Sequence, residues 1–506
     1  MTVTLVSVLS EAVAHAAVHF GDTPAVVVDD VGPTWAELHR ASEALAPMLI
    51  RRGVAAGDVV ALAMRSGPEW LVAASAVDRI GATMAGISPV ATAAERAAMV
   101  EKVDAGLVLA EADLTEGLSL RRQVARFGPD GLDDQQLADP GALLPDADRG
   151  PQRRYAVCFT SGTTGAPKAA SFSVRQAAAV ESIDLGATGV GAAGASSGFP
   201  TIASTQFAHV GFVLKVPWYA RLGCTIHVMR RWRADDAMAL LARHRIATLG
   251  VVAPQLALIL ASDQRAEHDL SALRLVIAGG APSPPSLVEQ ARRELGVDYS
   301  IRWSSTESGG VGLAALVDDD NPDAVGTIGT PRPGIRARVA DPGGDPMPDG
   351  EVGELQIDSP ATMDGYLGDP EATDAAFTAD GWLRTGDLAH VRDDGRFVLD
   401  GRSSDMYIRG GYNVHPEEVE AVLASHPAVR AVAVAPRPDS VMGEVGVAVV
   451  VPESPDSVPT LEELRATGSQ SLAHYKLPEA MLVVERLPLT DATKVDRRRL
   501  TEMVAP

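Results

Sequence analysis

Cysteine, aromatic side chains and positive charge are all scarce in this chain of 506 residues. The only two cysteines, Cys158 and Cys224, lie outside any metal-binding or redox motif, which argues against a disulfide framework and predicts a protein of the reducing cytoplasm. Lys and Arg number 44 against 66 Asp and Glu, which gives a net charge of −22. Because nucleic acids and anionic membranes bind basic surfaces, we expect neither as a partner.

Long hydrophobic runs are also missing. Residues 185–214 contain no Asp, Glu, Lys or Arg, but many Gly, Ser and Thr residues and Pro200 interrupt them, a composition typical of small-residue packing around a cavity. The first Lys or Arg is Arg40, so residues 1–20 lack the positive start of a signal peptide. Their apolar residues follow helical spacing and predict an amphipathic helix packed on the core. We therefore expect no stable membrane insertion.

The pattern that is present predicts an α/β fold. Short apolar strands alternate with amphipathic helices over residues 25–303. Thr34 with Glu37, and Thr92 with Glu95, have the spacing of the capping boxes that begin helices. We expect the polar, aperiodic residues 127–150 to form a surface loop.

The length of the chain predicts two or more domains. After Asn321, short strands separated by Pro- and Gly-containing turns predict a small β-rich subdomain. A different pattern begins near Gly401 and predicts a small α+β domain. We therefore predict an N-terminal domain of residues 1–401, built from α/β subdomains and the β-rich part, and a C-terminal domain of residues 402–506.

One short stretch concentrates groups that bind phosphate. Residues 159–168 read Phe-Thr-Ser-Gly-Thr-Thr-Gly-Ala-Pro-Lys. Glycines let a backbone approach a ligand closely, and backbone N–H groups, hydroxyls and an ammonium group donate to phosphate oxygens. The stretch therefore predicts a loop that holds a polyphosphate. Taken alone, the same residues are equally compatible with a polar surface turn.

Four further motifs follow in order: Trp-Ser-Ser-Thr-Glu at 303–307, Gly-Trp-Leu-Arg-Thr-Gly-Asp at 381–387, a segment at 401–420 that begins Gly-Arg, and a C-terminal segment at 488–500. With the loop at 160–168, they make the sequence resemble the adenylate-forming superfamily of acyl-CoA synthetases, nonribosomal-peptide adenylation domains and luciferases. The resemblance extends from about residue 22 to the C-terminus. It implies a large domain that binds ATP and an acyl group, and a small mobile domain that carries a catalytic lysine.

The resemblance implies how ATP is bound. The loop would hold the β- and γ-phosphates, Gly279–Ala281 would lie against adenine, Trp303 could stack on the base, and Asp387 would accept hydrogen bonds from the ribose hydroxyls. The ATP- or AMP-binding residues implied in this way are Thr160, Ser161, Gly162, Thr163, Thr164, Gly165, Lys168, Gly279, Gly280, Ala281, Trp303, Ser304, Asp387 and Arg402.

The resemblance also implies three catalytic residues. Thr306 would offer its hydroxyl to the α-phosphate, and Glu307 would be an oxygen ligand for Mg²⁺. Lys494 would bridge the attacking carboxylate and the α-phosphate, where it offsets charge that builds in the transition state. Taken singly, Glu307 would be an ordinary solvated carboxylate and Lys494 part of a solvated helix face.

The acyl pocket implied by the resemblance is lined by His209, Ser304, Gly309 and Gly310, although a lone histidine such as His209 is as often structural. Residues 207–214 hold no acidic side chain that could bind a substrate ammonium group. We therefore expect an acid without an α-amino group, with a bulky apolar acyl, alicyclic or aryl body. The family's usual Tyr and Gly are Trp303 and Ser304 here.

For the second half of the reaction, the resemblance implies a hinge at Ser404 and a channel for CoA at Gly410 and Gly411. Thr493 replaces the glycine that usually precedes the C-terminal lysine, which could stiffen that loop. The predicted function is the ATP-dependent activation of a carboxylic acid to acyl-AMP, with Mg²⁺, followed by transfer to CoA. Two alternatives stay open: transfer to a carrier protein or an amine, and a non-catalytic relative that only binds. The sequence does not indicate an oligomeric state.

Overall fold

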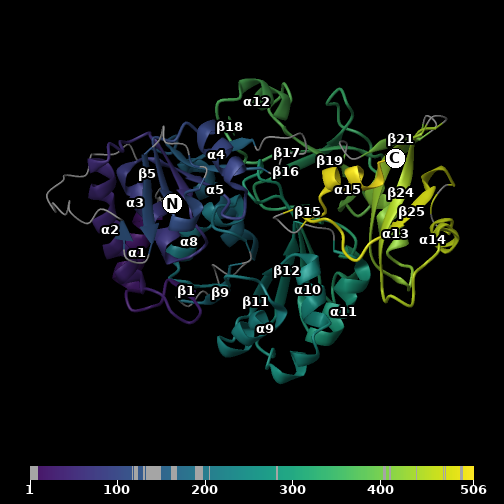
Figure 1. Ribbon diagram of the computed structural model, residues 1–506, viewed down its shortest axis with the longest axis horizontal. Helices are drawn as coiled ribbons and strands as arrows, with labels where there is room; N and C mark the ends of the chain where they lie inside the picture. Colours follow the sequence, from purple (N-terminus) through teal and green to yellow (C-terminus); the bar gives the residue numbers. More distant parts are fainter. Residues whose placement is uncertain are drawn as a thin grey trace. The chain divides into compact units, whose positions relative to one another are not determined.

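The computed structural model describes residues 9–116, 118, 123–128, 131–132, 150–160, 168–188, 198–203, 205–280, 283–402, 406–409, 412–439, 442–470, 472, 474–490 and 494–505 (Figure 1). None of the helices in this part of the chain is long and apolar enough to cross a membrane. The chain divides into two compact units: Met1–Ala337 with Ile357–Leu383, and Arg338–Gln356 with Arg384–Pro506.

The largest sheet of the first unit has the strand order β18-β8-β7-β3-β2-β4-β5-β6. The inner strands β7, β3, β2, β4 and β5 are parallel, whereas β8, β18 and β6 pair antiparallel at the edges. Every residue of β2, β3 and β4 is buried, as expected for parallel strands covered on both faces. The bounds are β2 (Val59–Ala63), β3 (Thr83–Gly86), β4 (Leu107–Ala110), β5 (Gln123–Gly128), β6 (Gly131–Leu132), β7 (Arg154–Phe159), β8 (Ala169–Ser173) and β18 (Gly365–Tyr366).

The helices of this region begin and end where local chemistry predicts. The two predicted capping boxes are confirmed. The side chains of Thr34 and Thr92 each accept from the N–H of the Glu three residues on, and the N–H of each Thr donates to that Glu carboxylate. Gly81 ends α3 in the left-handed conformation, with φ 85°. The bounds are α1 (Leu9–His19), α2 (Trp35–Arg51), α3 (Pro68–Ile80), α4 (Ala93–Lys102), η1 (Ala112–Leu114), α5 (Val174–Thr188) and α12 (Pro370–Ala376).

A buried carboxylate joins α1, α3 and the residue directly before β7. Ser10 donates through its N–H (2.8 Å) and its hydroxyl (2.7 Å) to Asp78 Oδ2, while Arg153 Nη2 donates to Asp78 Oδ1 at 2.5 Å. Both ends of the ion pair are almost completely buried. A buried charge is tolerated only when it is paired and hydrogen-bonded in this way, so the cluster fixes the first helix against the sheet.

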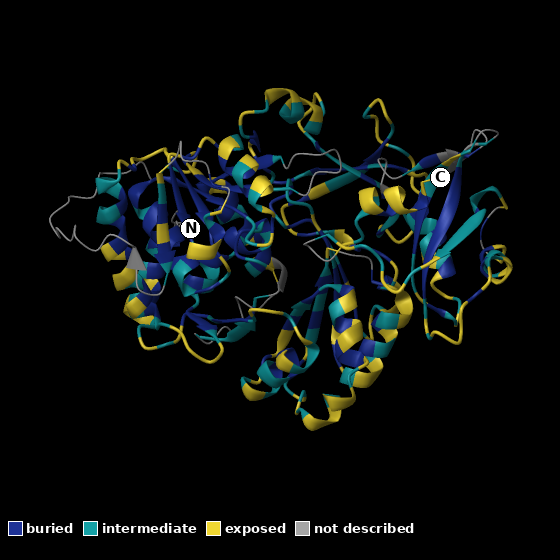
Figure 2. Ribbon diagram, viewed as in Figure 1, coloured by how far each residue is buried: buried dark blue, intermediate teal, exposed yellow. Residues whose placement is uncertain are grey.

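A second sheet of this unit has the order β11-β12-β13-β14-β15. The first three strands are parallel and the last two antiparallel. Alternate residues of its strands, such as Leu249, Val276 and Tyr299, join the buried cluster under the helices, and Figure 2 shows that the exposed residues lie on the outer helical faces. The bounds are α9 (Ala234–Arg243), β11 (Thr248–Val251), α10 (Ala253–Leu260), η3 (Asp263–Glu267), β12 (Leu275–Gly279), α11 (Pro285–Leu295), β13 (Asp298–Trp303), β14 (Leu313–Val317), η4 (Pro322–Ala324) and β15 (Thr330–Pro331).

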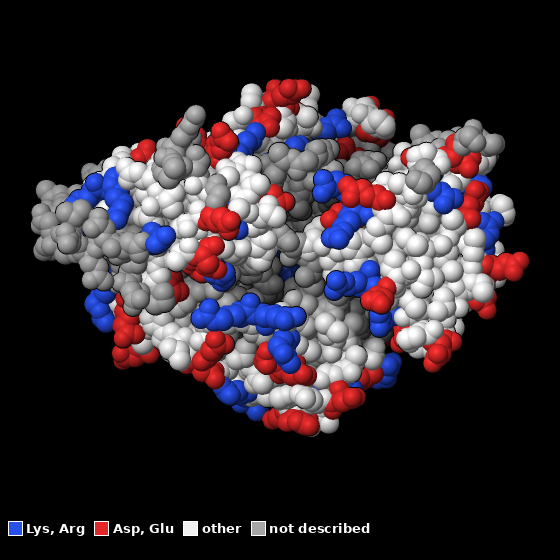
Figure 3. Space-filling view, in the orientation of Figure 1, with Lys and Arg blue, Asp and Glu red and all other residues white. Residues whose placement is uncertain are grey.

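A small parallel sheet, β1-β10-β9, and two short helices also belong to the first unit. Their bounds are β1 (Val26–Val28), β9 (Pro200–Ile202), α7 (Val210–Val213), α8 (Val216–Arg221) and β10 (Thr225–Val228). Asp, Glu, Lys and Arg side chains are interspersed on the face of the molecule drawn in Figure 3.

The second unit contains two sheets, with the orders β16-β17-β19-β20 and β22-β21-β24-β23, and β25 pairs with β24. Strands β19 and β20 pair antiparallel, as suits the β-rich character predicted for the residues after Asn321. The bounds are β16 (Arg336–Ala340), β17 (Gly353–Asp358), β19 (Leu383–Val391), β20 (Phe397–Arg402), β21 (Tyr407–Arg409), β22 (Tyr412–Val414), α13 (Pro416–Leu423), β23 (Val429–Asp439), β24 (Gly443–Pro452), α14 (Leu461–Gly468), η5 (His474–Lys476), β25 (Ala480–Val483) and α15 (Arg497–Val504).

The predicted fold class, mixed α/β with a smaller α+β C-terminal part, is confirmed. The predicted domain boundary at 401/402 stays a prediction, since the compact units describe packing and the boundary concerns motion. The predicted surface loop at 127–150 is wrong at its start. Phe127 is buried in β5, and residues 131–132 form β6, because these residues extend the sheet edge beyond β4.

A buried histidine predicts how stability depends on pH. His227 on β10 packs on the His244 ring, with ring centroids 4.0 Å apart. Burial and His244 lower the pKa of His227 to about 4, with Asp30 opposing and Arg243 reinforcing this shift. Between about pH 6.5 and about pH 4 the unfolded chain therefore holds a proton that the folded chain does not, so the free energy of unfolding falls as the pH falls.

His227→Phe keeps a ring and removes the titration. We expect the loss of unfolding free energy between pH 7.5 and pH 5, measured by urea denaturation, to shrink by up to about 2 kcal/mol in this variant. His268→Phe, at a half-exposed site of the same unit, is the control and should keep the parent's pH dependence. An unchanged pH dependence in His227→Phe would contradict the assignment.

Candidate active site

The predicted phosphate loop joins two strands at the edge of the large sheet. β7 ends at Phe159 and β8 begins at Ala169, and the N–H of Thr160 donates to the carbonyl of Lys168 at 3.0 Å. The loop is therefore closed at its base by a backbone hydrogen bond. The predicted residues Ser161, Gly162, Thr163, Thr164 and Gly165 lie outside the described residues.

Two neighbouring parallel strands carry the residues predicted to hold the nucleotide. β12 ends at Gly279, and Gly280 follows with φ 74°. β13 ends at Trp303, which is buried. Because the carboxyl ends of adjacent parallel strands meet at one sheet edge, the structure brings Gly279 and Gly280 beside Trp303 and Ser304. Ala281 lies outside the described residues.

Thr306 and Glu307 lie in a tight turn directly after β13. The Ser305 and Ser308 side chains accept from each other's N–H groups at 3.1 and 3.0 Å, and Gly309 N–H donates to the Thr306 carbonyl at 3.0 Å. Gly309 has φ 77°, and a Cβ there would lie 2.4 Å from the Ala361 carbonyl oxygen. Only glycine fits this position, so the turn that presents Thr306 and Glu307 depends on it.

Glu307 is bound to a segment far along the sequence. Its carboxylate Oε1 accepts a hydrogen bond of 2.8 Å from the Tyr366 hydroxyl, and its carbonyl accepts from Met363 N–H at 2.9 Å. The Nζ of Lys168 lies 5.0 Å from the centroid of the Tyr366 ring. The structure therefore brings the predicted metal ligand and the lysine of the phosphate loop to the two sides of one tyrosine. The sequence analysis missed Tyr366.

The donor set fits magnesium held mainly by a nucleotide. Within the described residues there is no group of three or more His, Cys, Asp and Glu side chains that could hold a metal alone. Glu307 uses Oε1 to accept from Tyr366, which leaves Oε2 for a cation. Mg²⁺ commonly takes one or two protein carboxylates and completes its shell with phosphate oxygens and water, so a single Glu is a suitable ligand.

The structure brings some of the residues predicted to line the acyl pocket close together. A Cβ on Gly310 would lie 3.4 Å from Gly211 Cα, so the turn after β13 packs closely on the segment that follows the half-buried His209. Phe207 and Phe212 stack with their ring centroids 3.6 Å apart. Neighbouring backbone thus occupies the space beside Gly309 and Gly310, and their role in lining a pocket stays a prediction.

A buried charge cluster lies near the same strand end and was also missed. Asp184 on α5 pairs with Arg332 (2.8 Å) and Lys215 (3.3 Å). Burial opposes ionisation of Asp184, but the two cations outweigh it and lower its pKa. Burial, together with the charge of Arg332, lowers the pKa of Arg302 on β13 to about 10. Two cations thus pair with Asp184, and the charge of a third, Arg302, also interacts with it, so positive side chains outnumber this carboxylate.

The second unit carries the predicted ribose ligand. Asp387 on β19 is buried and stands opposite Arg402 on β20 in the strand register. Its N–H donates to Thr385 Oγ1 at 3.1 Å, and that hydroxyl donates to the Leu355 carbonyl at 2.6 Å. The structure thus brings Asp387 and Arg402 together as cross-strand neighbours. Ser404, Gly410 and Gly411 lie outside the described residues, as does the side chain of Arg402.

Lys494 is exposed at the base of a loop of the second unit. The N–H of Thr490 donates to the Lys494 carbonyl at 2.7 Å. The chain then enters α15, whose N-cap Asp496 accepts from Arg499 N–H at 3.0 Å. Arg497 pairs with Glu420 of α13 and so anchors the start of the helix. An exposed lysine on an anchored loop suits a group that acts on a ligand.

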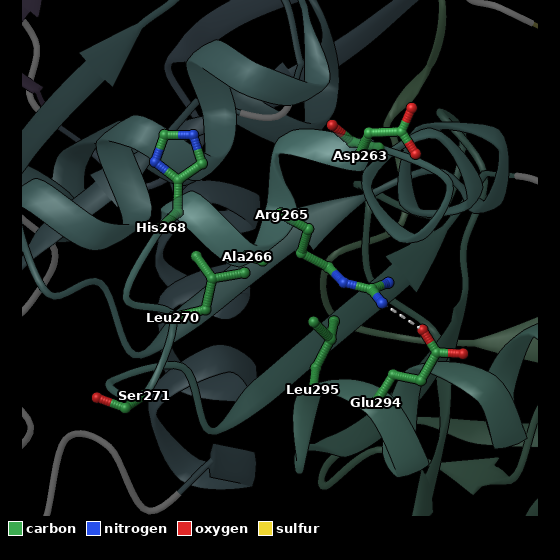
Figure 4. Close-up of a pocket in the computed structure, with 9 residues that line it drawn as sticks. Asp263, Arg265, Ala266, His268, Leu270, Ser271, Glu294 and Leu295 are labelled. Carbon is green, nitrogen blue, oxygen red and sulfur yellow. Dashed lines mark ion pairs between the residues drawn. The ribbon is translucent and has the colours of Figure 1, made fainter.

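Two pockets of the first unit lie elsewhere. One is lined by residues of η3 and the end of α11, where the Arg265 and Glu294 side chains point toward one another and pair at 2.7 Å (Figure 4). The other lies near Gly57, Gly81 and Arg154, at the amino ends of the parallel strands. Neither pocket contains a predicted site residue. Both lie near the amino ends of the parallel strands, whereas the predicted site residues follow the carboxyl ends.

A family model described as AMP-binding enzyme matches residues 13–367, and one described as AMP-binding enzyme C-terminal domain matches residues 418–494. The chain therefore belongs to the AMP-binding enzyme family, and the predicted superfamily is confirmed.

Individual relatives indicate which class of AMP-binding enzyme the chain resembles. The chain is 32% identical over 502 residues to a methyl-dioxo-octahydro-indenyl-propanoyl:CoA ligase of Mycobacterium tuberculosis, covering 95% of this chain and 96% of the relative. It is 30% identical to indoleacetate–CoA ligase of Aromatoleum aromaticum, over 97% of both chains. ATP-bound MatB from Rhodopseudomonas palustris has a similar structure, with a TM-score of 0.86 and 25% identity over 98% of each chain. The predicted enzyme class, an AMP-forming acid–CoA ligase, is confirmed.

The close packing of Trp303 on Gly312 predicts that adding a methyl group at position 312 destabilises the fold. A Cβ on Gly312 would lie 2.5 Å from the Trp303 carbonyl oxygen and 2.7 Å from its ring. We expect Gly312→Ala to lower the free energy of unfolding by about 1–3 kcal/mol and to shift the tryptophan fluorescence, because β13 and β14 must move apart. Gly106→Ala, where a Cβ would meet nothing within 4 Å, is the matched control. Equal stability of both variants would show that the close contact at Gly312 is not real.

Proposed function

We propose that this enzyme adenylates a carboxylic acid that has no α-amino group and carries a bulky apolar acyl, alicyclic or aryl body, and then transfers the acyl group to CoA. The observation that carries the proposal is the convergence of Lys168, Glu307 and Tyr366 beside the base of the phosphate loop, next to the strand ends that carry Gly280 and Trp303. Glycine-rich strand ends of this kind suit a nucleotide.

The chemistry must bring two anions together, a carboxylate and the α-phosphate of ATP. The loop from Thr160 to Lys168 holds the departing β- and γ-phosphates, and Thr306 donates its hydroxyl to the α-phosphate. Glu307 would hold Mg²⁺, which would neutralise charge on the phosphates. Lys494 supplies further positive charge as the new bond forms, and Asp387 with Arg402 binds the ribose.

The nature of the acid follows from the chemistry of residues 207–214. They carry two stacked phenylalanines and no acidic side chain, and Trp70 contacts both rings edge-on. Apolar side chains at the acyl site would favour an apolar ligand, and residues 207–214 offer nothing to pair with an ammonium group. Relatives that act on a bicyclic propanoic acid and on indoleacetate support the same class. Ser404 as the hinge, and Gly410 and Gly411 as the CoA channel, complete the proposal.

The proposed reaction predicts which components the release of each product requires. With purified protein, MgATP and a panel of alicyclic, aryl, fatty and amino acids, we expect pyrophosphate release that requires both Mg²⁺ and an acid without an α-amino group. AMP should then be released only when CoA is added. AMP release with a carrier protein or an amine, but not with CoA, would show that CoA is not the acyl acceptor. No pyrophosphate release with any acid would contradict the proposal as a whole.

The role of Lys494 predicts that its removal affects the two half-reactions differently. We expect Lys494→Ala to slow adenylation by at least about 100-fold while transfer from preformed acyl-AMP to CoA falls by less than about threefold, because its charge is needed only as the two anions meet. Single-turnover rates measure both steps.

Arg498→Ala is the control for this test, since that side chain is 82% exposed on the same unit. It should leave both rates as in the parent protein. Equal losses in the two half-reactions of Lys494→Ala would contradict the proposed role.

A further inference from the structure

Tyr366 contacts two side chains that the proposed function assigns to the phosphates of ATP, Glu307 and Lys168. Its hydroxyl donates to Glu307 Oε1 at 2.8 Å, and its ring faces Lys168 Nζ, 5.0 Å from the centroid. The side chain is 9% exposed. Among the described residues no ion pair joins Lys168 to Glu307 directly. One buried tyrosine therefore links the lysine of the phosphate loop to the carboxylate.

The backbone holds Tyr366 in this place. Gly365 and Tyr366 pair with Ser171 and Ala170 of β8, and Leu367 N–H donates to the Ala169 carbonyl at 2.8 Å. Tyr366 is thus fixed to the strand that begins directly after Lys168.

The neighbouring glycine makes this pairing possible. Gly365 has φ 143°, and a Cβ there would lie 2.6 Å from Thr373 Cγ2. Thr373 Oγ1 in turn accepts from the Tyr366 N–H at 2.9 Å. Any other residue at 365 would displace Thr373 or the strand, so the position of the tyrosine is set by a glycine and a threonine hydroxyl.

The same segment also holds Glu307. The Met363 N–H donates to the Glu307 carbonyl at 2.9 Å, three residues before the tyrosine. Residues 363–367 therefore connect the turn after β13 to the base of the phosphate loop, by backbone bonds at both ends and by the tyrosine side chain between them.

The chemistry of the phenol suits a positioning role. The Glu307 carboxylate can only accept a hydrogen bond, so the Tyr366 hydroxyl is the donor of the bond that joins them. A donor on Oε1 fixes the carboxylate while Oε2 keeps its lone pairs for a cation. The ring face attracts an ammonium group without neutralising it, so Lys168 keeps its full charge for a phosphate.

We propose that Tyr366 is a positioning residue, which holds the Glu307 carboxylate with one oxygen open for Mg²⁺ and holds Lys168 beside it, so that metal and lysine serve the same pyrophosphate group. The inference rests on the proposed function for the identity of the metal and the nucleotide. It adds a residue that acts through two others and touches neither the acid nor the reacting phosphorus.

Tyr366→Phe separates the hydroxyl from the ring. Mn²⁺ binding in the presence of a non-hydrolysable ATP analogue, followed by electron paramagnetic resonance, should weaken about three- to tenfold, because one hydrogen bond to the ligand carboxylate is lost. The Mg²⁺ concentration for half-maximal pyrophosphate release should rise by the same factor, with the KM of the acid unchanged. Tyr155→Phe, which removes a buried hydroxyl that donates to the Val213 carbonyl, is the matched control and should leave Mn²⁺ affinity unchanged.

A double-mutant cycle tests whether the Tyr366 hydroxyl affects Mn²⁺ affinity through Glu307. In a Glu307→Gln background, Tyr366→Phe should change Mn²⁺ affinity less than twofold, because the phenol acts through that carboxylate. Tyr366→Leu, which also removes the ring, should weaken metal-free binding of the ATP analogue about threefold, whereas Tyr366→Phe should not.

Parent-like Mn²⁺ affinity in Tyr366→Phe, or an undiminished effect in the Glu307→Gln background, would overturn the role of the hydroxyl. Parent-like binding of the analogue in Tyr366→Leu would overturn the role of the ring. A parent protein that binds Mn²⁺ and nucleotide but releases no pyrophosphate with any acid would contradict the proposed function and leave the binding tests of Tyr366 fully interpretable.

Discussion

The pairing of Gly365 and Tyr366 with the edge of the large sheet is the interaction on which the candidate site depends. This two-residue strand places a tyrosine from beyond residue 360 beside a loop that ends at residue 168. The same segment reaches the turn after β13 through Met363 and Glu307. Three parts of the chain that lie far apart in sequence therefore share one rigid connection. The loop and the turn otherwise belong to different sheets.

Charge explains why so much of the site is buried or paired. The chain has a net charge of −22, yet its proposed ligands are a carboxylate and a polyphosphate. Positive side chains near the ligands must therefore outweigh the negative potential of the whole protein. Lys168 lies over the ring of Tyr366 and does not form an ion pair with Glu307 within the described residues. Arg332 and Lys215 both pair with Asp184, and the charge of Arg302 also interacts with that carboxylate. In both places cationic charge is left over for an anion.

Features set by neighbouring residues could be predicted from the sequence. Thr34 and Thr92 begin helices because their partners are three residues away, and Gly279 and Trp303 end strands of clear apolar pattern. Features set by distant contacts could not. β8 has the weak strand sequence Ala-Ala-Ser-Phe-Ser and is extended because β7 and β18 pair with it. Tyr366 and the Asp184 cluster carry no local signal, since their partners lie more than 50 residues away or on other elements.

The central claim is that the carboxylate of the acid attacks the α-phosphorus of ATP. The most direct test uses an acid labelled with ¹⁸O in both carboxylate oxygens, with MgATP and CoA, and mass spectrometry of the products. Attack at the α-phosphorus followed by cleavage of the acyl carbon–oxygen bond leaves one ¹⁸O in AMP and none in pyrophosphate. Label in inorganic phosphate or pyrophosphate, or its absence from AMP while acyl-CoA forms, would contradict the account.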